Sequence, residues 1–84
     1  MELTAPVINL NGNDKDTLLR EILGSVTSCK ETIDKIATLQ YSNGRNAIDN
    51  DHRLTMDREK GAMITQIFEI RDSLIGLYNE IKSI

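Results

Sequence analysis

The sequence contains no tryptophan, one proline and one cysteine among its 84 residues. Tyr41, Phe68 and Tyr78 are the only aromatic residues, so most of the apolar content is aliphatic. Cys29 has no second cysteine to pair with inside the chain, which fits a reducing cytoplasm. Apolar residues occur only in short runs, so the sequence predicts neither a membrane-spanning helix nor a signal peptide.

Positive charge is also scarce. The net charge is −3, with 10 Lys and Arg residues against 13 Asp and Glu residues. A protein that binds DNA or RNA usually carries a clustered basic face with aromatic side chains among the cations, and this sequence has no such stretch. We therefore expect neither a DNA nor an RNA duplex as a partner.

Catalytic signatures are absent as well. His52 is the only histidine, which excludes an HExxH zinc motif and a histidine-rich metal site. The sequence contains no GxxxxGK[ST] phosphate loop and no GxSxG nucleophile elbow, and Cys29 lies far from His52 along the chain. We expect no enzymatic activity, no cofactor and no metal.

What the sequence does contain is a long helical pattern over residues 51–84. Apolar residues recur there at alternating spacings of three and four, which is typical of an amphipathic helix that packs along its whole length. This first stripe consists of Ile67, Ile70, Leu74, Leu77, Ile81 and Ile84. A second stripe beside it consists of Ile64, Phe68, Ile75 and Tyr78. One neighbour cannot cover so wide an apolar face, so we expect this helix to contact at least two others.

The same spacing predicts an earlier helix over residues 14–41, with Asp14 or Asp16 as its N-cap. Its apolar stripe consists of Leu19, Ile22, Val26, Cys29, Ile33 and Ile36. Because Cys29 falls on this stripe, we interpret it as a small buried apolar residue. The helix is expected to end at Gln40 or Tyr41, before Asn43 or Gly44 in the left-handed position.

These elements form a single all-α domain over residues 1–84. An extended arm and turn occupy residues 1–13, and a loop at 42–50 joins the helix at 14–41 to the helix at 51–84. The two helices are expected to form an antiparallel hairpin. A hairpin of two helices buries few side chains against the entropy of ordering its chain, so we expect a homo-oligomeric helical bundle, a dimer or a tetramer.

A group of cations near residue 51 departs from the usual helix pattern. Followed backwards from Ile67, the first stripe passes into Met63, Lys60, Met56 and Arg53. Arginines and His52 gather around this helix start, where the helix dipole favours acidic residues instead. One interpretation is a helix end whose cations pair with Asp49, Asp51, Asp57 and Glu59. The other is an anion site, in which arginines and helix N–H groups bind a phosphate and Tyr41 stacks on a base.

Three short motifs give the chain a resemblance to a widespread set of small phage proteins. The motifs are Ile8-Asn9-Leu10-Asn11-Gly12, Asn43-Gly44-Arg45-Asn46 and Asp51-His52-Arg53. They resemble a strand and turn ending in LNG, an NGRD loop, and a helix that starts with HR. The resemblance covers most of the chain and departs from the pattern at Asn46, where the pattern has an acidic residue.

Such phage proteins are similar to the oligomeric anti-CBASS and anti-Thoeris proteins, which sequester nucleotide second messengers of bacterial immunity. The resemblance implies a phage immune-evasion protein of the host bacterial cytoplasm. Its ligand would be a cyclic oligonucleotide or an ADP-ribose derivative, bound without chemical change. The expected ligand-binding residues are Asn11, Gly12, Asn13, Tyr41, Asn43, Gly44, Arg45, Asn46, His52 and Arg53. The alternative is a structural or protein-binding helical module, such as an inhibitor of a host enzyme or a virion-assembly factor.

The turn at 11–13 and the loop at 43–46 are expected at opposite ends of the first helix, roughly 39 Å apart at 1.5 Å per residue. Within one hairpin the two motifs cannot share a pocket. Two hairpins paired head to tail would bring the turn of one beside the loop of the other. We therefore expect composite sites at subunit junctions.

Overall fold

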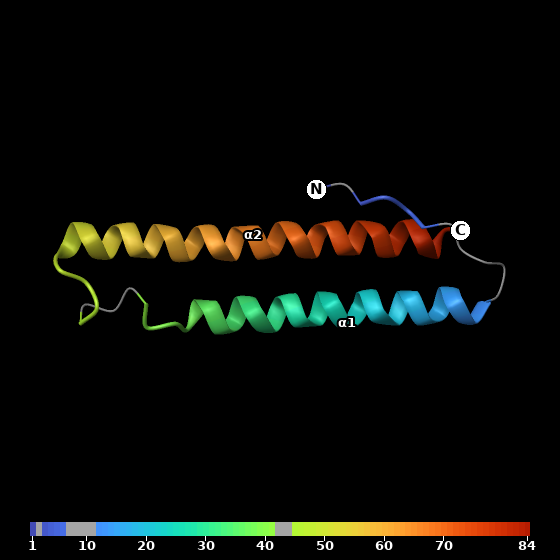
Figure 1. Ribbon diagram of the computed structural model, residues 1–84, viewed down its shortest axis with the longest axis horizontal. Coiled ribbons are helices and arrows are strands. Elements are labelled where there is room, and N and C mark those ends of the chain that lie inside the picture. The colour runs from blue at the N-terminus through green and yellow to red at the C-terminus, as the bar shows by residue number, and fades with distance from the viewer. Residues whose placement is uncertain (2, 7–11, 42–44) are drawn as a thin grey trace.

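The computed structural model describes residues 1, 3–6, 12–41 and 45–84. Two helices, α1 (Gly12–Ala37) and α2 (Asn50–Lys82), lie side by side and run antiparallel (Figure 1). The Cα atoms extend over 59 × 19 × 12 Å, so the molecule is long and one layer of helices thick. No strand occurs among the described residues, and the predicted all-α hairpin is confirmed. Residues 7–10 of the predicted extended segment lie outside the described residues.

α1 packs through the stripe that the sequence predicted. Ile22 and Ile33 are buried, while Val26, Cys29 and Ile36 are half-buried. Alternating spacings of three and four bring these side chains to one face of the helix, which α2 covers. The half-buried position of Cys29 agrees in part with its interpretation as a buried apolar residue.

α2 meets α1 along a line that differs from the first stripe. Met56 and Ile81 are buried, whereas Ile70 is 47% exposed and Ile84 is 61% exposed, so the prediction that the latter two lie in the contact was wrong. The half-buried residues that continue the observed line are Lys60, Ile64, Ile67, Arg71, Leu74 and Tyr78. Long polar side chains can cover apolar surface with their stems while their charged or polar ends reach solvent. The contact therefore includes Lys60 and Arg71, which a pattern of apolar residues leaves out.

The observed helix ends differ from the predicted ones by a few residues. α1 begins at Gly12, before the proposed caps, and ends at Ala37 rather than Gln40 or Tyr41. The N–H groups of Thr38 and Leu39 donate to carbonyls three residues earlier, at 3.2 and 3.1 Å, which tightens the final turn and ends the helix. The predicted left-handed positions at 43 and 44 lie outside the described residues.

α2 begins at Asn50, one of the two predicted start positions (Asn50 or Asp51), because Asp49 caps it. The Asp49 backbone is extended, and its Oδ1 atom accepts a hydrogen bond of 2.8 Å from the His52 N–H. This geometry satisfies one of the backbone donors that a helix start leaves without an intrahelical acceptor. Over the residues described, neither α1 nor α2 has a stretch that is long and apolar enough to cross a bilayer.

The N-terminal residues lie against α2. Ser73 Oγ donates a hydrogen bond of 2.6 Å to the carbonyl of Met1, and Leu3 borders an apolar hollow of about 550 Å³ with Ile70 and Leu74. Figure 1 shows this arm beside the C-terminal half of α2, on the side away from α1. Part of the wide apolar face of α2 is thus covered by the arm instead of by a further helix.

A lysine joins the two helices at the end of the molecule away from the connecting loop. Lys15 Nζ donates to the carbonyls of Ile84, at 2.9 Å, and Lys82, at 3.4 Å. These carbonyls lie at the C-terminal end of α2, where the helix dipole favours a cation. The first turn of α1 and the last turn of α2 are therefore held together by polar contacts.

Replacing Ile81 by alanine tests the importance of the line between the helices. The Ile81 side chain is 0% exposed, so removing it should lower the free energy of unfolding by about 2–5 kcal/mol. Ile48→Ala is the matched control, because Ile48 is 89% exposed and its loss should change stability by less than about 0.5 kcal/mol. Urea unfolding followed by circular dichroism measures both values. Equal losses at the two positions would contradict the described packing.

Candidate functional site

Most of the described candidate residues lie at one end of the hairpin, in and beside the connection between α1 and α2. Tyr41, Arg45 and Asn46 belong to the connection, and His52 and Arg53 lie in the first turn of α2. Gly12 and Asn13 begin α1 at the opposite end of the molecule (Figure 1). Asn11, Asn43 and Gly44 lie outside the described residues. The two motifs are thus separated within one chain by the length of α1, as the sequence predicted.

Tyr41 is held by a carboxylate from α2. Its hydroxyl donates a hydrogen bond of 3.0 Å to Glu59 Oε2. The hydrogen bond to the carboxylate raises the pKa of Tyr41 above its ordinary value of 10.0, and partial burial and the negative charge of Glu59 raise it further. The ring is 38% exposed and stays accessible from solvent. Stacking on a base therefore remains open to Tyr41 while its hydroxyl is anchored.

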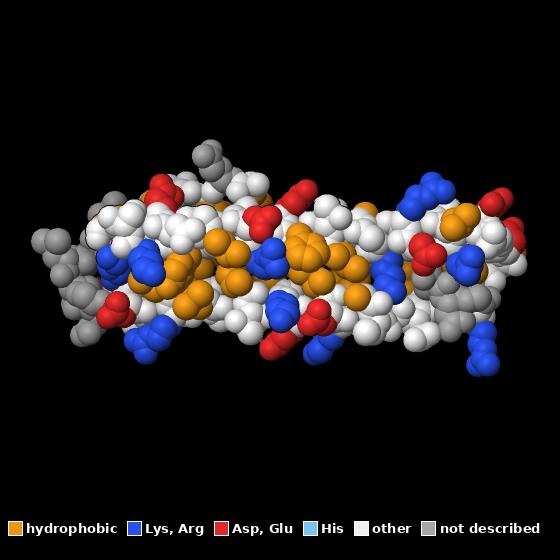
Figure 2. Space-filling view, turned by 180° about the vertical axis from the view of Figure 1, so that it is seen from behind, with side chains coloured by type: hydrophobic (Ala, Val, Ile, Leu, Met, Phe, Trp, Pro, Cys, Tyr) orange, Lys and Arg blue, Asp and Glu red, His pale blue; other side chains and the backbone are white. Residues whose placement is uncertain are grey.

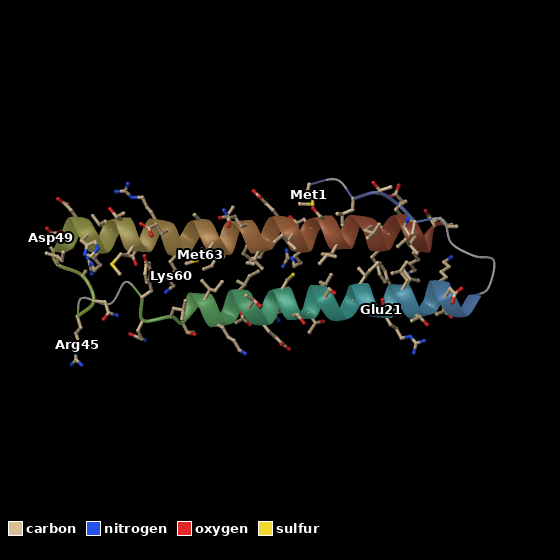
Figure 3. All side chains as sticks on the ribbon, viewed as in Figure 1. Met1, Glu21, Arg45, Asp49, Lys60 and Met63 are labelled. Carbon is tan, nitrogen blue, oxygen red and sulfur yellow. The ribbon has the colours of Figure 1, made fainter. Side chains whose placement is uncertain are left out.

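Two further side chains hold the connection by its backbone. Lys60 Nζ donates to the carbonyl of Leu39 at 3.2 Å, and Asn46 Nδ2 donates to the carbonyl of Gln40 at 2.7 Å. In Figure 3, Lys60 reaches from α2 towards the connection, whereas Arg45 points away from both helices. Lys60 therefore helps to fix the backbone of the connection, while Arg45 extends away from both helices.

The start of α2 carries a compact set of hydrogen bonds. Ile48 N–H donates a hydrogen bond of 2.9 Å to His52 Nδ1, so this ring nitrogen acts as the acceptor. Arg53 donates to Asn50 Oδ1, also at 2.9 Å. Because Asp49 already engages the His52 N–H, a phosphate at this helix start would compete with that carboxylate.

Three of the residues considered for simple ion pairs have other partners. Glu59 accepts from Tyr41, Asp49 accepts from the backbone of His52, and Arg53 donates to a neutral asparagine. The link between Tyr41 and Glu59 spans 18 positions, and no periodicity in the sequence signals it. The sequence pattern places Lys60 on the apolar stripe, but it does not predict the hydrogen bond from Lys60 to the backbone of the connection.

A shallow hollow of about 290 Å³ lies beside the start of α2. It is lined by Ala47, Ile48, Asp49, Asn50 and Arg53. Arg53 contributes a cation and Asp49 an anion, and Ile48 adds an exposed apolar side chain. Sequence reasoning missed Ala47 and Ile48, because two apolar residues within a polar loop form no periodic signal.

Among the described residues, no group of three or more His, Cys, Asp or Glu side chains is placed to hold a metal ion. The end of the hairpin instead presents guanidinium groups and a partly exposed phenol ring. Arginine binds phosphate through paired N–H donors, and tyrosine stacks on planar bases. These groups suit recognition of an anionic, aromatic ligand.

Substitution of Glu59 tests the anchor on Tyr41. The folded chain holds the tyrosine proton more tightly than the unfolded chain, so the contribution to stability is present below about pH 10 and is lost as the pH rises through the folded pKa. Glu59→Gln should lower the pKa of Tyr41 towards its ordinary value. Tyrosinate absorbance in a Tyr78→Phe background measures this, with Glu80→Gln as the control. An unchanged titration in Glu59→Gln would contradict the contact.

Comparison with protein-family models, curated proteins and solved structures found no match for this chain. The residues at the loop end of the hairpin therefore provide the structural basis for inferring its function.

Proposed function

We propose that the chain is a non-catalytic phage protein that binds and sequesters a small nucleotide signal of bacterial defence as a homo-oligomer in the host cytoplasm. The observation that carries the proposal is that Arg45, Arg53 and the partly exposed Tyr41 all lie in or beside the connection, at one end of the hairpin. Cations and a stacking surface are the groups that recognise a nucleotide. The motif resemblance supplies the class of ligand, a cyclic oligonucleotide or an ADP-ribose derivative.

The size of the hollow at this end supports a site completed by a second chain. Small-molecule sites usually measure about 300–1,000 Å³ and bury most of the ligand. The hollow beside Arg53 measures about 290 Å³ and is shallow, so one chain would enclose only part of a nucleotide. The surface around it stays open, because Ile48, which borders it, is 89% exposed.

The second part of the site would come from the turn before α1. Gly12 begins α1 at the end of the hairpin opposite to Arg45, so the two motifs meet only between chains. A head-to-tail arrangement of two hairpins brings each turn beside the other chain's loop and yields two equivalent sites around a two-fold axis.

A structural or protein-binding helical module is the second candidate, and exposed apolar side chains favour it. Phe68, Ile70 and Ile75 are 39–47% exposed on α2. In a nucleotide-binding oligomer these side chains should become covered by other copies of the chain. In a protein-binding module they should remain on the surface of the assembled oligomer.

The ligand and the arginines are tested together. A thermal-shift screen against cyclic dinucleotides, cyclic trinucleotides and ADP-ribose derivatives should find a ligand that raises Tm, because a ligand that binds only the folded state stabilises it. Arg45→Ala and Arg53→Ala should each weaken that binding by about 1.5–3 kcal/mol in calorimetry, since hydrogen bonds to charged groups are lost. Helicity should stay the same.

Arg20→Ala serves as the matched control, because Arg20 is an exposed arginine on α1. Its effect on binding should be negligible. If none of these nucleotides raises Tm, the proposed ligand class is wrong. If Arg45→Ala and Arg53→Ala both unfold the protein, the arginines have a structural role instead.

Mixed oligomers test whether the sites are shared between chains. An Asn11→Ala chain and an Arg45→Ala chain should each bind poorly alone. When the two are mixed and refolded together, some junctions combine both wild-type halves, so calorimetry should show partial recovery of binding. Absence of recovery in oligomers shown by mass spectrometry to be mixed would place each site within one chain.

A further inference from the structure

The outer flank of α2 carries a stripe that α1 leaves uncovered. Gly61, Phe68 and Ile75 follow one another at seven-residue steps, so they lie along one line of the helix. Phe68 and Ile75 are each 39% exposed. Figure 2 shows apolar side chains gathered along the junction between the two helices on one face, with Lys and Arg side chains among them. An aromatic ring and an isoleucine on one line need a cover that the hairpin does not provide.

Arg71 lies beside this stripe, and one of its nitrogen donors has no hydrogen-bond acceptor among the described residues. Its guanidinium carbon is 4.7 Å from the centre of the Phe68 ring, and one terminal nitrogen is 3.5 Å from Asp72 Oδ1. The Nε atom is buried and has no hydrogen-bond acceptor among the described residues. The Arg71 side chain as a whole is 32% exposed, so its terminal N–H groups can donate to an acceptor on a second chain.

Gly61 is a second feature that contacts among the described residues do not explain. A glycine within a helix lowers stability relative to alanine. A Cβ atom at this position would meet no other atom within 4 Å, so packing inside the hairpin does not require glycine there. Its place on the Phe68 stripe suits close approach of another helix or of a ring.

The exposed area is larger than expected for a compact chain of this mass. The structure exposes 6294 Å², whereas a compact 9.5 kDa protein exposes about 5,000 Å². A stable protein–protein interface covers about 800 Å² on each partner. The excess is therefore large enough to supply one interface of standard size, and the stripe with Phe68 is an uncovered apolar surface that suits it.

We propose that this flank of α2 packs against the same flank of a second copy of the chain, antiparallel and around a two-fold axis near Ile64. Arg71 follows Ile64 by seven residues and Asp57 precedes it by seven, so the axis brings Arg71 opposite Asp57 of the partner subunit, twice. Phe68 then meets the region of Gly61 of the partner subunit. Asp57 is exposed and has no polar partner among the described residues, so its carboxylate is available.

This inference rests on the proposed homo-oligomer and adds the contact that builds it. It also gives the terminal nitrogens of Arg71 a carboxylate partner and places Phe68 against the region of Gly61 of the partner subunit, from a single symmetric arrangement. The two copies form a four-helix bundle, in which the apolar side chains along both junctions become its core.

Cross-linking tests the contact. In a Cys29→Ala background, Ile64→Cys places one thiol from each chain near the axis, where a disulfide needs Cα atoms about 4.4–6.8 Å apart. Oxidation with copper phenanthroline, or addition of a short bismaleimide, should yield a covalent dimer in high yield. Gln66→Cys is the matched control, because Gln66 is exposed and borders the arm on another side of α2, and it should yield little dimer.

The charge pair is tested separately. Asp57→Lys should raise the dissociation constant of the dimer at least tenfold in analytical ultracentrifugation, because it places a cation opposite Arg71. Asp57 is exposed within its own chain, so helicity should be unchanged. Glu80→Lys, at an exposed position away from the stripe, is the control and should have little effect.

The outcomes separate the two proposals. A mass that is a multiple of 9.5 kDa, with cross-linking at Gln66→Cys but not at Ile64→Cys, overturns this contact and leaves the homo-oligomer intact. An oligomer that forms neither cross-link, or that Asp57→Lys leaves unchanged, also overturns the contact. A folded monomer at micromolar concentration overturns both proposals.

Discussion

Contact along a single line between two antiparallel helices is the constraint on which the rest of this molecule depends. A helix offers one stripe to one neighbour, so the pair buries few side chains. Among the described residues these are Ile22, Ile33, Met56 and Ile81. Every other apolar side chain needs a cover from elsewhere, and the N-terminal arm covers only part of α2. Folding of the hairpin therefore buries part of the apolar surface, and association of chains would bury more of it.

The same constraint shapes the connection between the helices. The apolar line ends near Met56, and polar side chains around it hold the chain together. Lys60 and Asn46 bind backbone carbonyls, and Glu59 binds the hydroxyl of Tyr41. Two of these three groups come from α2, so that helix fixes the connection from outside. Arginines placed beside such a connection sit at an edge that a neighbouring subunit can reach.

Pattern and composition were sufficient to predict two helices, their antiparallel pairing and the packing stripe of α1. The full contact line of α2 could not be found in this way, because Arg71 contributes an apolar stem that a count of apolar residues ignores. The grouping of Arg45 and Arg53 followed from their places on either side of one helix start. Their partners did not, because a hydrogen bond such as that between Arg53 and Asn50 depends on side-chain conformation.

A repeating apolar stripe does not by itself fix how two helices are aligned along their axes, whereas the polar contacts at the ends of this hairpin do. Two helices whose apolar residues recur every seven positions can slide past each other by one repeat and still bring apolar groups together. Lys15 joins the start of α1 to the last carbonyls of α2, and Lys60 joins α2 to the backbone beyond α1. A slide by one seven-residue repeat, about 10.5 Å at 1.5 Å per residue, would break both contacts at once. Several alignments of the two helices would bury similar amounts of apolar surface. The two lysine contacts favour one of them, because they form only in that alignment.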